Sequence, residues 1–283
     1  MGSRMAANLR RAGFELTVWN RTAEKARAWA EEHGAELAAS PAELAGRCDF
    51  VITMVVDGPQ VEGVLLGPDR VASGARPGLL CVDMSTIAPE TTRGVGAKLE
   101  EAGVGFVDAP VTGSSPKAED GTLTIMAGGE EADVKRAWPL FEAMGKLIVH
   151  VGPLGQGETL KLIGNAVAAA NAVTVAQALL LARATDVDLD ALTEILSAGS
   201  GGSTMLDLKA KPMREHDYTT LFKLDHMIKD VTLCLEQSRA AGVPCPSVEV
   251  AAEVLAGAAD RGYGEEDFAA VIEEIEARAG RRL

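Results

Sequence analysis

Apolar and polar positions alternate in two different periods along the first half of the chain. Short β-rich runs occupy residues 16–19, 50–55 and 79–83 and Gly105–Asp108, and each ends near a polar residue. Between them lie stretches with helical spacing, such as Ala23–His33 and residues 89–102. Strands that alternate with amphipathic helices are typical of a parallel sheet covered by helices, so this half predicts an α/β domain.

The ends of one predicted helix carry recognisable signals. Thr22 precedes Ala23–His33, and its hydroxyl is suited to cap the first turn. Gly34 follows the helix and is a good C-terminal stop, because glycine adopts the left-handed conformation without strain.

The pattern changes after His150, where the β-rich runs stop and helical spacing continues to the C-terminus. The Gly-Pro-containing segment 151–155 is typical of a hinge. We therefore expect a Rossmann-type dinucleotide-binding domain over residues 1–153 and an all-α domain over 154–283. Residues 162–182 carry no charge and are long enough to span a bilayer. Polar residues and many alanines dilute this stretch, which favours a helix buried within protein.

Charge and cysteine content narrow the possible partners. The 283 residues carry a formal net charge of -14, which argues against nucleic acid but allows a locally basic pocket for a small anion. The four cysteines have no C-x-x-C spacing, so reduced thiols are expected and no metal site is predicted. No secretion signal opens the chain, which indicates a cytoplasmic protein without a membrane partner.

The first residues are similar to the helix that follows a dinucleotide-binding turn. An intact G-x-G-x-x-G unit has three glycines after a first strand. Only the third, Gly2, is present, and the sequence predicts that the first strand is absent, as in an N-terminally truncated unit. An ordinary N-terminal glycine is the structural alternative.

The end of the second strand offers a clue to the cofactor. A carboxylate there would accept the ribose hydroxyls of NAD, but this chain has Arg21, whose guanidinium matches a 2′-phosphate. Asn20 and Thr22 can add hydrogen bonds. NADP(H) is thus the expected cofactor and NAD(H) a possible one, while a solvated arginine that opens a helix is the alternative.

Several ordered motifs together resemble the β-hydroxyacid dehydrogenases, the family that contains 3-hydroxyisobutyrate dehydrogenase, tartronate semialdehyde reductase and the glyoxylate/succinic semialdehyde reductases. The resemblance covers essentially the whole chain. The motifs are Met1-Gly2 with Met5-Ala6 and Asn8-Leu9, Asn20-Arg21-Thr22, Asp83-Met84-Ser85-Thr86, Asp108-Ala109-Pro110-Val111-Thr112-Gly113, Gly155-Gln156-Gly157 with Lys161 and Asn165, and Lys229-Asp230.

The resemblance implies that Thr112, Gly113 and Ser114 hold the substrate carboxylate. Thr112 stands where the family usually has serine, which narrows the pocket by one methyl group. The resemblance also places Thr86 beside the nicotinamide. From the second domain it implies cofactor contacts by Phe222 and Lys229 and a substrate contact by Asp230. A core phenylalanine and a surface ion pair are the structural alternatives.

Lys161 and Asn165 are the candidate catalytic pair. They are four residues apart, which places both on one face of a helix. Carbonyl reduction puts negative charge on oxygen as hydride arrives, and Lys161 can donate the proton. Desolvation by the uncharged helix should lower the pKa of Lys161 toward working pH. A solvated lysine in a first turn is the structural alternative.

Together these residues predict reversible hydride transfer between NADP(H) and a small β-hydroxy acid, semialdehyde or 2-oxo acid, of the glyoxylate, succinic semialdehyde or 3-hydroxyisobutyrate class. Residues 114–123 resemble the glyoxylate/succinic semialdehyde reductase branch more than the hydroxyisobutyrate branch. The long apolar helix and the family suggest a homo-oligomer. The alternative is a non-catalytic nucleotide-binding or assembly module, motivated by the absent phosphate-facing glycines. Imine reduction is disfavoured by the carboxylate-holding loop and the lysine donor.

Overall fold

The structure is a computed structural model that describes all 283 residues. The chain divides into two compact units, Met1–Lys161 and Leu162–Leu283, and each is described by itself. The division lies inside helix α9 (Gln156–Ala184), later along the chain than the boundary between residues 153 and 154 that the sequence predicts.

The first unit is built on a six-stranded sheet in the order β3-β4-β5-β7-β6, with β8 paired to β7. Strands β3, β4 and β5 are parallel, as predicted, whereas β7 runs antiparallel to both β5 and β6 and parallel to β8, so the sheet is mixed rather than fully parallel. The bounds are β3 Phe50–Thr53, β4 Leu80–Asp83, β5 Gly105–Asp108, β6 Val111–Thr112, β7 Leu123–Gly128 and β8 Gly145–Gly152.

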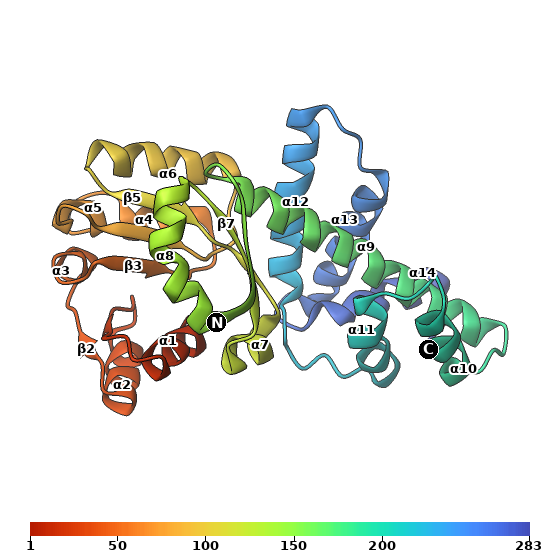
Figure 1. Cartoon of the computed structure of the whole chain (residues 1–283). Coiled ribbons are helices and arrows are strands. Elements are labelled where there is room, and N and C mark those ends of the chain that lie inside the picture. Colours follow the sequence, from red (N-terminus) through yellow and green to blue (C-terminus); the bar gives the residue numbers. More distant parts are fainter. The chain divides into compact units, whose positions relative to one another are not determined.

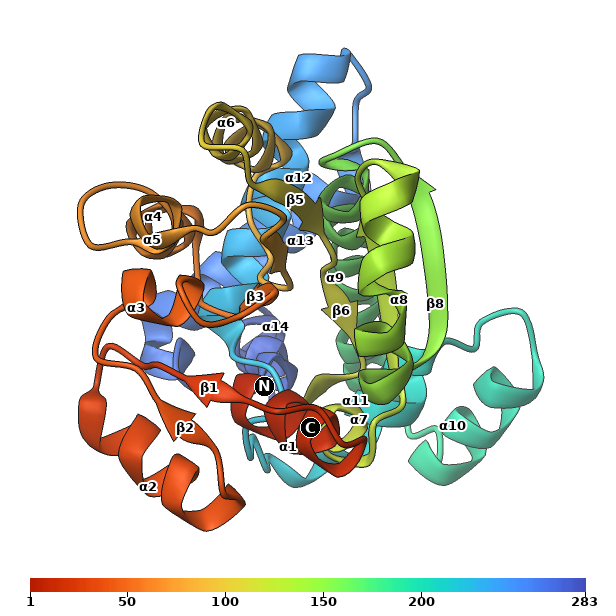
Figure 2. The same ribbon diagram turned by 60° about the vertical axis from the view of Figure 1, so that its left-hand side comes forward.

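A separate two-stranded sheet pairs β1 (Thr17–Val18) with β2 (Glu36–Leu37) in parallel. Helix α1 (Gly2–Arg11) precedes β1, and α2 (Ala23–His33) connects the two strands. Figure 2 shows β1 and β2 beside α1 and α2, away from β8 at the other side of this unit. The two sheets share no hydrogen-bonded strand.

Helices cover both faces of the six-stranded sheet (Figures 1 and 2). Along β4, Leu80 and Val82 face one apolar core and Cys81 faces the other, as the two-residue period of a strand requires. One core includes residues of α1, α7 (Ser114–Asp120) and α8 (Glu131–Met144). The other includes residues of α3 (Pro41–Ala45), α4 (Gly58–Leu65), α5 (Val71–Gly74) and α6 (Pro89–Glu101).

The second unit is all-α, as predicted. Besides the later part of α9 it contains α10 (Leu189–Ala198), α11 (Thr204–Glu215), α12 (Leu224–Ala241), α13 (Pro246–Ala258) and α14 (Val271–Ala279). A short π-helix covers Ala259–Tyr263 and a short 3-10 helix covers Phe268–Ala270. Its core includes Ala169, Ala172 and Ala176, whose small side chains let other helices approach α9 closely.

Helix α9 is long and apolar enough to cross a membrane by length and composition alone. Half of its most apolar stretch is buried inside the structure, and the core helix of a globular protein can have the same length and composition.

The ends of α2 test the helix signals. The helix spans Ala23–His33, and Gly34 adopts the left-handed conformation with φ 65°, both as predicted. The capping role expected of Thr22 is wrong, because its hydroxyl makes no cap hydrogen bond. Instead the Thr22 backbone N–H donates to Asn20 Oδ1 at 2.8 Å, which closes a tight turn between β1 and α2.

Candidate functional site

The carboxyl ends of β3, β4 and β5 lie at one edge of the sheet, where open α/β folds bind ligands. Asp83, at the end of β4, is fully buried. Its Oδ1 accepts hydrogen bonds from Thr53 Oγ1 and Ser85 Oγ, both at 2.7 Å. Ser85 Oγ in turn accepts from the Val55 N–H at 3.0 Å. This network ties together the segments that follow β3 and β4.

Burial raises the pKa of Asp83 above its ordinary value, and the hydrogen bonds from Ser85 and Thr53 oppose this effect. The other carboxyl oxygen, Oδ2, has no hydrogen-bond partner. A neutral carboxyl group suits this environment, because a buried charge with one unsatisfied oxygen is costly.

Thr86 lies in the segment that follows β4, at the same edge. The next residue is fixed, because the Ile87 backbone N–H donates to Glu158 Oε2 at 3.2 Å. Glu158 is fully buried in the first turn of α9. The candidate nicotinamide-facing segment is therefore attached to the start of the helix that carries Lys161.

The candidate cofactor residues of the first unit occupy the N-terminus of α1 and the turn after β1. Arg21 is exposed and forms no hydrogen bond or ion pair within the chain, so its guanidinium is available to an external anion. Asn20 shapes this turn through its bond from Thr22 N–H. A Cβ built at Gly2 would lie 3.5 Å from Met54 Cβ, an ordinary contact, so packing against the neighbouring segment does not itself require glycine there.

The candidate substrate loop joins β6 to α7. Thr112 is exposed at the end of β6, and its backbone pairs with Thr124 of β7. Gly113 has φ +133°, and an added Cβ would lie 2.6 Å from Lys117 Cβ, so both conformation and space require glycine. Ser114 also has a positive φ of 56°, which is strained for a residue with a side chain. The exposed Thr112 is therefore followed by two residues, Gly113 and Ser114, with an unusual backbone conformation.

Lys161 and Asn165 both lie on α9, four residues apart, as predicted. Lys161 is only 7% exposed and Asn165 only 8% exposed. The alternative of a solvated first-turn lysine is therefore wrong, because lysines are rarely buried to this extent.

Asn165 belongs to a polar cluster in the second unit. Its Nδ2 donates to Asp230 Oδ2 at 2.5 Å, and Lys229 Nζ lies 2.8 Å from Asp230 Oδ1. Asp230 is 1% exposed, so it links the two neighbours from inside α12. The structure thus brings together three residues that the sequence singled out: one oxygen of Asp230 is hydrogen bonded to Asn165, and the other lies within ion-pair distance of Lys229.

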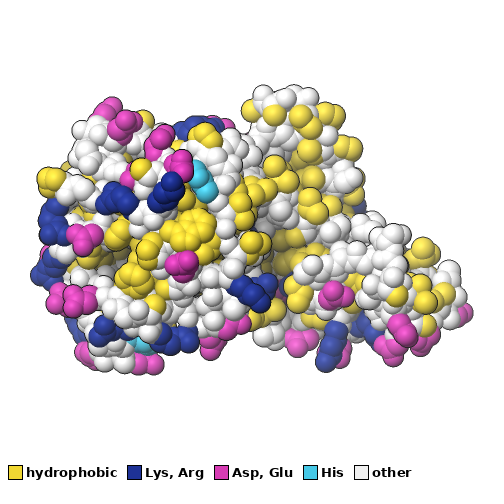
Figure 3. Space-filling model, viewed as in Figure 1, with side chains coloured by type: hydrophobic (Ala, Val, Ile, Leu, Met, Phe, Trp, Pro, Cys, Tyr) yellow, Lys and Arg dark blue, Asp and Glu magenta, His cyan; other side chains and the backbone are white.

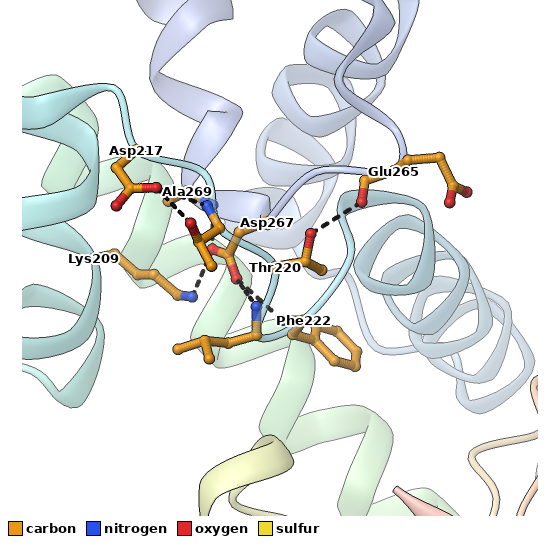
Figure 4. A network of polar contacts seen from close by, with 9 residues as sticks. Lys209, Asp217, Thr220, Phe222, Glu265, Asp267 and Ala269 are labelled. Carbon is orange, nitrogen blue, oxygen red and sulfur yellow. Dashed lines mark hydrogen bonds and ion pairs between the residues drawn. The ribbon is translucent and has the colours of Figure 1, made fainter.

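Phe222 lies just before α12, in a segment held by a buried ion pair (Figure 4). Asp267 Oδ2 accepts the backbone N–H groups of Leu221 and Phe222 at 3.1 and 3.0 Å. Its Oδ1 lies 2.7 Å from Lys209 Nζ, and both charged side chains are almost fully buried. Asp267 therefore fixes the backbone that presents the Phe222 ring.

A group of metal-ligand types in the second unit was not foreseen. His216, Glu273 and Glu276 bring their ligand atoms within 4.8 Å of one another. They have protein partners: His216 Nε2 lies 3.0 Å from Glu276 Oε1, Tyr218 donates to Glu273, and Arg282 forms ion pairs with both glutamates. A cation would have to displace Arg282, so this cluster is explained by contacts within the chain. All four cysteines are free thiols.

Sequence reasoning assigned no role to Asp83, Glu158 or Asp267. The signal for Asp83 was visible, because a charged residue ends an otherwise apolar strand. No local signal marks Glu158, whose partner Ile87 lies 71 residues away along the chain. Asp267 is a local N-cap that accepts the Ala269 N–H, but its ion pair with Lys209, 58 residues away, has no local signal.

Comparison with known proteins covers both units. Residues 1–152 match the family described as the NAD binding domain of 6-phosphogluconate dehydrogenase. Residues 155–275 match the family described as NAD-binding of NADP-dependent 3-hydroxyisobutyrate dehydrogenase.

The chain is also similar to individual proteins over nearly its whole length. It is 34% identical to glyoxylate/succinic semialdehyde reductase 1 of Arabidopsis thaliana over 97% of this chain and 95% of that protein. It is 33% identical to the chloroplastic reductase 2 of the same plant, over 99% of this chain and 78% of the relative. A structure of Mycobacterium tuberculosis 3-hydroxyisobutyrate dehydrogenase with L-serine superposes with a TM-score of 0.88 at 31% identity, covering 97% of this chain and 95% of the other.

Proposed function

Since the chain belongs to the β-hydroxyacid dehydrogenase family of NAD(P)-dependent oxidoreductases, we propose that it transfers a hydride between NADP(H) and a small β-hydroxy acid, semialdehyde or 2-oxo acid. The observation that carries this proposal is the buried Lys161 on α9, four residues before an Asn165 that is held by Asp230. A buried amine beside a fixed amide suits proton transfer to a carbonyl oxygen.

The preference for NADP(H) rests on Arg21. Its exposed, unpartnered guanidinium follows β1, where a 2′-phosphate could accept two parallel hydrogen bonds. The N-terminal turn of α1 contains no acidic residue, so its free N–H groups suit a pyrophosphate. Thr86, Phe222 and Lys229 are the remaining cofactor residues that we propose.

In the reduction, NADPH supplies the hydride when bound. Lys161 donates the proton to the substrate oxygen, and it takes the proton back in the oxidation direction. Asn165 orients the substrate or the lysine, while Asp230 orients Asn165 through the 2.5 Å hydrogen bond. Burial of these groups excludes water, which strengthens their electrostatic effect on the developing alkoxide.

We propose that Thr112, Gly113 and Ser114 bind the substrate carboxylate through hydroxyl and backbone donors. A small acid fits this proposal, since L-serine, named with the Mycobacterium tuberculosis structure, is itself a three-carbon β-hydroxy acid. The two Arabidopsis relatives favour glyoxylate and succinic semialdehyde as the first substrates to assay.

The partners follow from the same reasoning. We propose a homo-oligomer in the cytoplasm that binds a small carboxylate and neither nucleic acid nor membrane. Figure 3 shows charged side chains of both signs scattered over the visible face, with no continuous basic patch. A net charge of -14 also disfavours a polyanionic partner.

The proposal is tested by steady-state assays of the purified chain with glyoxylate and with succinic semialdehyde, each with NADPH and with NADH. Turnover with a higher kcat/KM for NADPH is expected. An NADH preference of about tenfold or more would refute the role of Arg21. Tight NADPH binding without turnover on any small oxo acid would favour the non-catalytic module instead.

A further inference from the structure

Asp108 ends β5 and has no role in the proposed chemistry, yet it is fully buried. Its Oδ1 accepts the Gly155 backbone N–H at 2.8 Å, and its Oδ2 accepts the Glu158 N–H at 2.9 Å. Because α9 begins at Gln156, one donor is the residue just before the helix and the other lies in its first turn. Asp108 therefore caps α9 from the sheet, although it lies 47 residues before the first donor.

This cap satisfies two of the N–H groups that a helix leaves without intrahelical partners. A carboxylate at this end is also favoured by the helix dipole. Burial raises the pKa of Asp108, and the backbone N–H groups of Gly155, Glu158 and Gly157 act in the opposite direction.

The approach between sheet and helix leaves no room for side chains. A Cβ built at Gly157 would lie 2.3 Å from Met126 O and 2.7 Å from Asp108 Oδ2. A Cβ at Gly128 of β7 would lie 2.5 Å from Asp108 Oδ1. The first turn of α9 is thus held directly against β5 and β7 and cannot shift toward them.

A second attachment acts on the same turn. Glu158 Oε2 accepts the Ile87 N–H, so the turn is connected to the segment after β4 as well as to the end of β5. Lys161 follows one turn later, and the helical hydrogen bond from its N–H reaches Gly157. Any displacement of the first turn is therefore transmitted to Lys161.

We propose that Asp108 is a positioning residue for Lys161, which it fixes through the first turn of α9; this inference rests on the proposed function. Without the cap, the protein would keep the same apolar cores, but the position of the Lys161 amine would be less well defined. A misplacement of about 1 Å can cost about a hundredfold in rate.

The test is a double-mutant cycle with Asp108→Asn and Lys161→Ala, measured as kcat and KM with NADPH and glyoxylate. The asparagine keeps the size of the side chain but turns one acceptor into a donor that faces a backbone N–H. We expect Asp108→Asn to lower kcat about tenfold to a hundredfold with little change in KM for NADPH. In the Lys161→Ala background the same substitution should change the residual kcat less than about twofold, because coupled residues are not additive.

An equal loss of kcat in both backgrounds would overturn the inference while leaving Lys161 catalytic. Near-wild-type kcat in Lys161→Ala alone would instead refute the proposed function. Asp83→Asn is the matched control, since Asp83 is equally buried and pairs in register with Asp108, yet its side chain hydrogen bonds with Thr53 and Ser85 and not with α9. Asp83→Asn should change kcat by the same factor in the wild type and in the Lys161→Ala variant.

If Asp108→Asn does not fold, Gly157→Ala gives a second route, because the added Cβ pushes the same turn away from Met126 O. Gly94→Ala is its control, since a Cβ at Gly94, also within a helix of this unit, meets nothing within 4 Å. We expect a loss of kcat for Gly157→Ala only. A folded Gly157→Ala variant with unchanged kcat would contradict the inference.

Discussion

At the scale of single residues, Arg21 shows what a sequence can and cannot predict. The sequence predicts its binding preference, because an arginine at the end of a strand favours a 2′-phosphate over ribose hydroxyls. The sequence does not predict whether Arg21 is free to bind an anion, since only the structure shows an exposed guanidinium without a partner in the chain. The expected cap by Thr22 is wrong, because the Lys25 N–H donates to the backbone carbonyl of Thr22 and not to its hydroxyl.

Replacing Arg21 with alanine should weaken NADPH use selectively. Losing charge-assisted hydrogen bonds of about 1.5–3 kcal/mol corresponds to an increase of about tenfold to a hundredfold in KM for NADPH. KM for NADH should stay within about twofold. Arg27→Ala, which removes an exposed arginine from α2, is the matched control and should change neither KM. A parallel loss with both cofactors would contradict the assignment.

The buried Asp83 predicts a pH dependence of stability. Its folded pKa lies above its unfolded value, so the folded protein binds the proton more tightly. The corresponding stability is present below the unfolded pKa and is lost as pH rises through the folded pKa. From about pH 4 upward, the melting temperature should therefore fall less steeply with pH in Asp83→Asn than in the wild type.

Asp217 provides the opposite control for this measurement. Hydrogen bonds from Thr219 lower the pKa of its exposed carboxyl group, so its contribution to stability is present at neutral pH and lost on acidification. Asp217→Asn should not reduce the slope above pH 4, and the same slope in wild type and Asp83→Asn would refute the effect of Asp83.

At the scale of elements, local pattern was sufficient where an element is regular. Strand β5 and helix α2 lie where the sequence placed them, because a period of two and a clear glycine stop leave little ambiguity. Strands β2, β6, β7 and β8 were not among the predicted strands. Strands β2 and β6 have two residues each, and β8 has three consecutive apolar residues at 147–149 without the alternation of a half-buried strand.

The conformation of the segment that carries Phe222 could not be predicted from the sequence, because it depends on a long-range ion pair. Asp267→Ala would leave Lys209 buried without its counter-charge and remove acceptors from Leu221 and Phe222. We expect a loss of about 3–5 kcal/mol in the free energy of unfolding of the second unit, measured with denaturant. The exposed pair of Lys223 with Glu265 is the control: Lys223→Ala should cost less than about 1 kcal/mol. Equal small losses would show that Asp267 does not hold this segment.

At the scale of the whole molecule, the change from alternating elements to helices was enough to predict an α/β unit followed by an all-α unit. The predicted boundary between residues 153 and 154 lies between the two family matches, which end at 152 and begin at 155. The division into compact units falls a few residues later, because a 29-residue helix continues through it. Similarly, sequence motifs named Asn165, Lys229 and Asp230 separately, but only folding shows them in one cluster.

The proposed homo-oligomer makes a prediction at this scale. Ile163, Val167 and Leu181 are 50%, 53% and 65% exposed, and their spacing places them on one face of α9. Leu181→Glu should therefore lower the mass measured by light scattering, whereas Ile195→Glu, on the neighbouring helix α10, should not. A wild-type mass near the 29.5 kDa of one chain would contradict the oligomer.

The central claim is that Lys161 delivers the proton that accompanies hydride transfer. Its most direct test is a single-turnover measurement in which the chain, preloaded with NADPH, is mixed with glyoxylate or succinic semialdehyde and the loss of NADPH absorbance is followed. Lys161→Ala should bind NADPH with unchanged affinity and oxidise it about a hundredfold to ten-thousandfold more slowly than the wild type. Equal single-turnover rates in the two proteins would contradict the account.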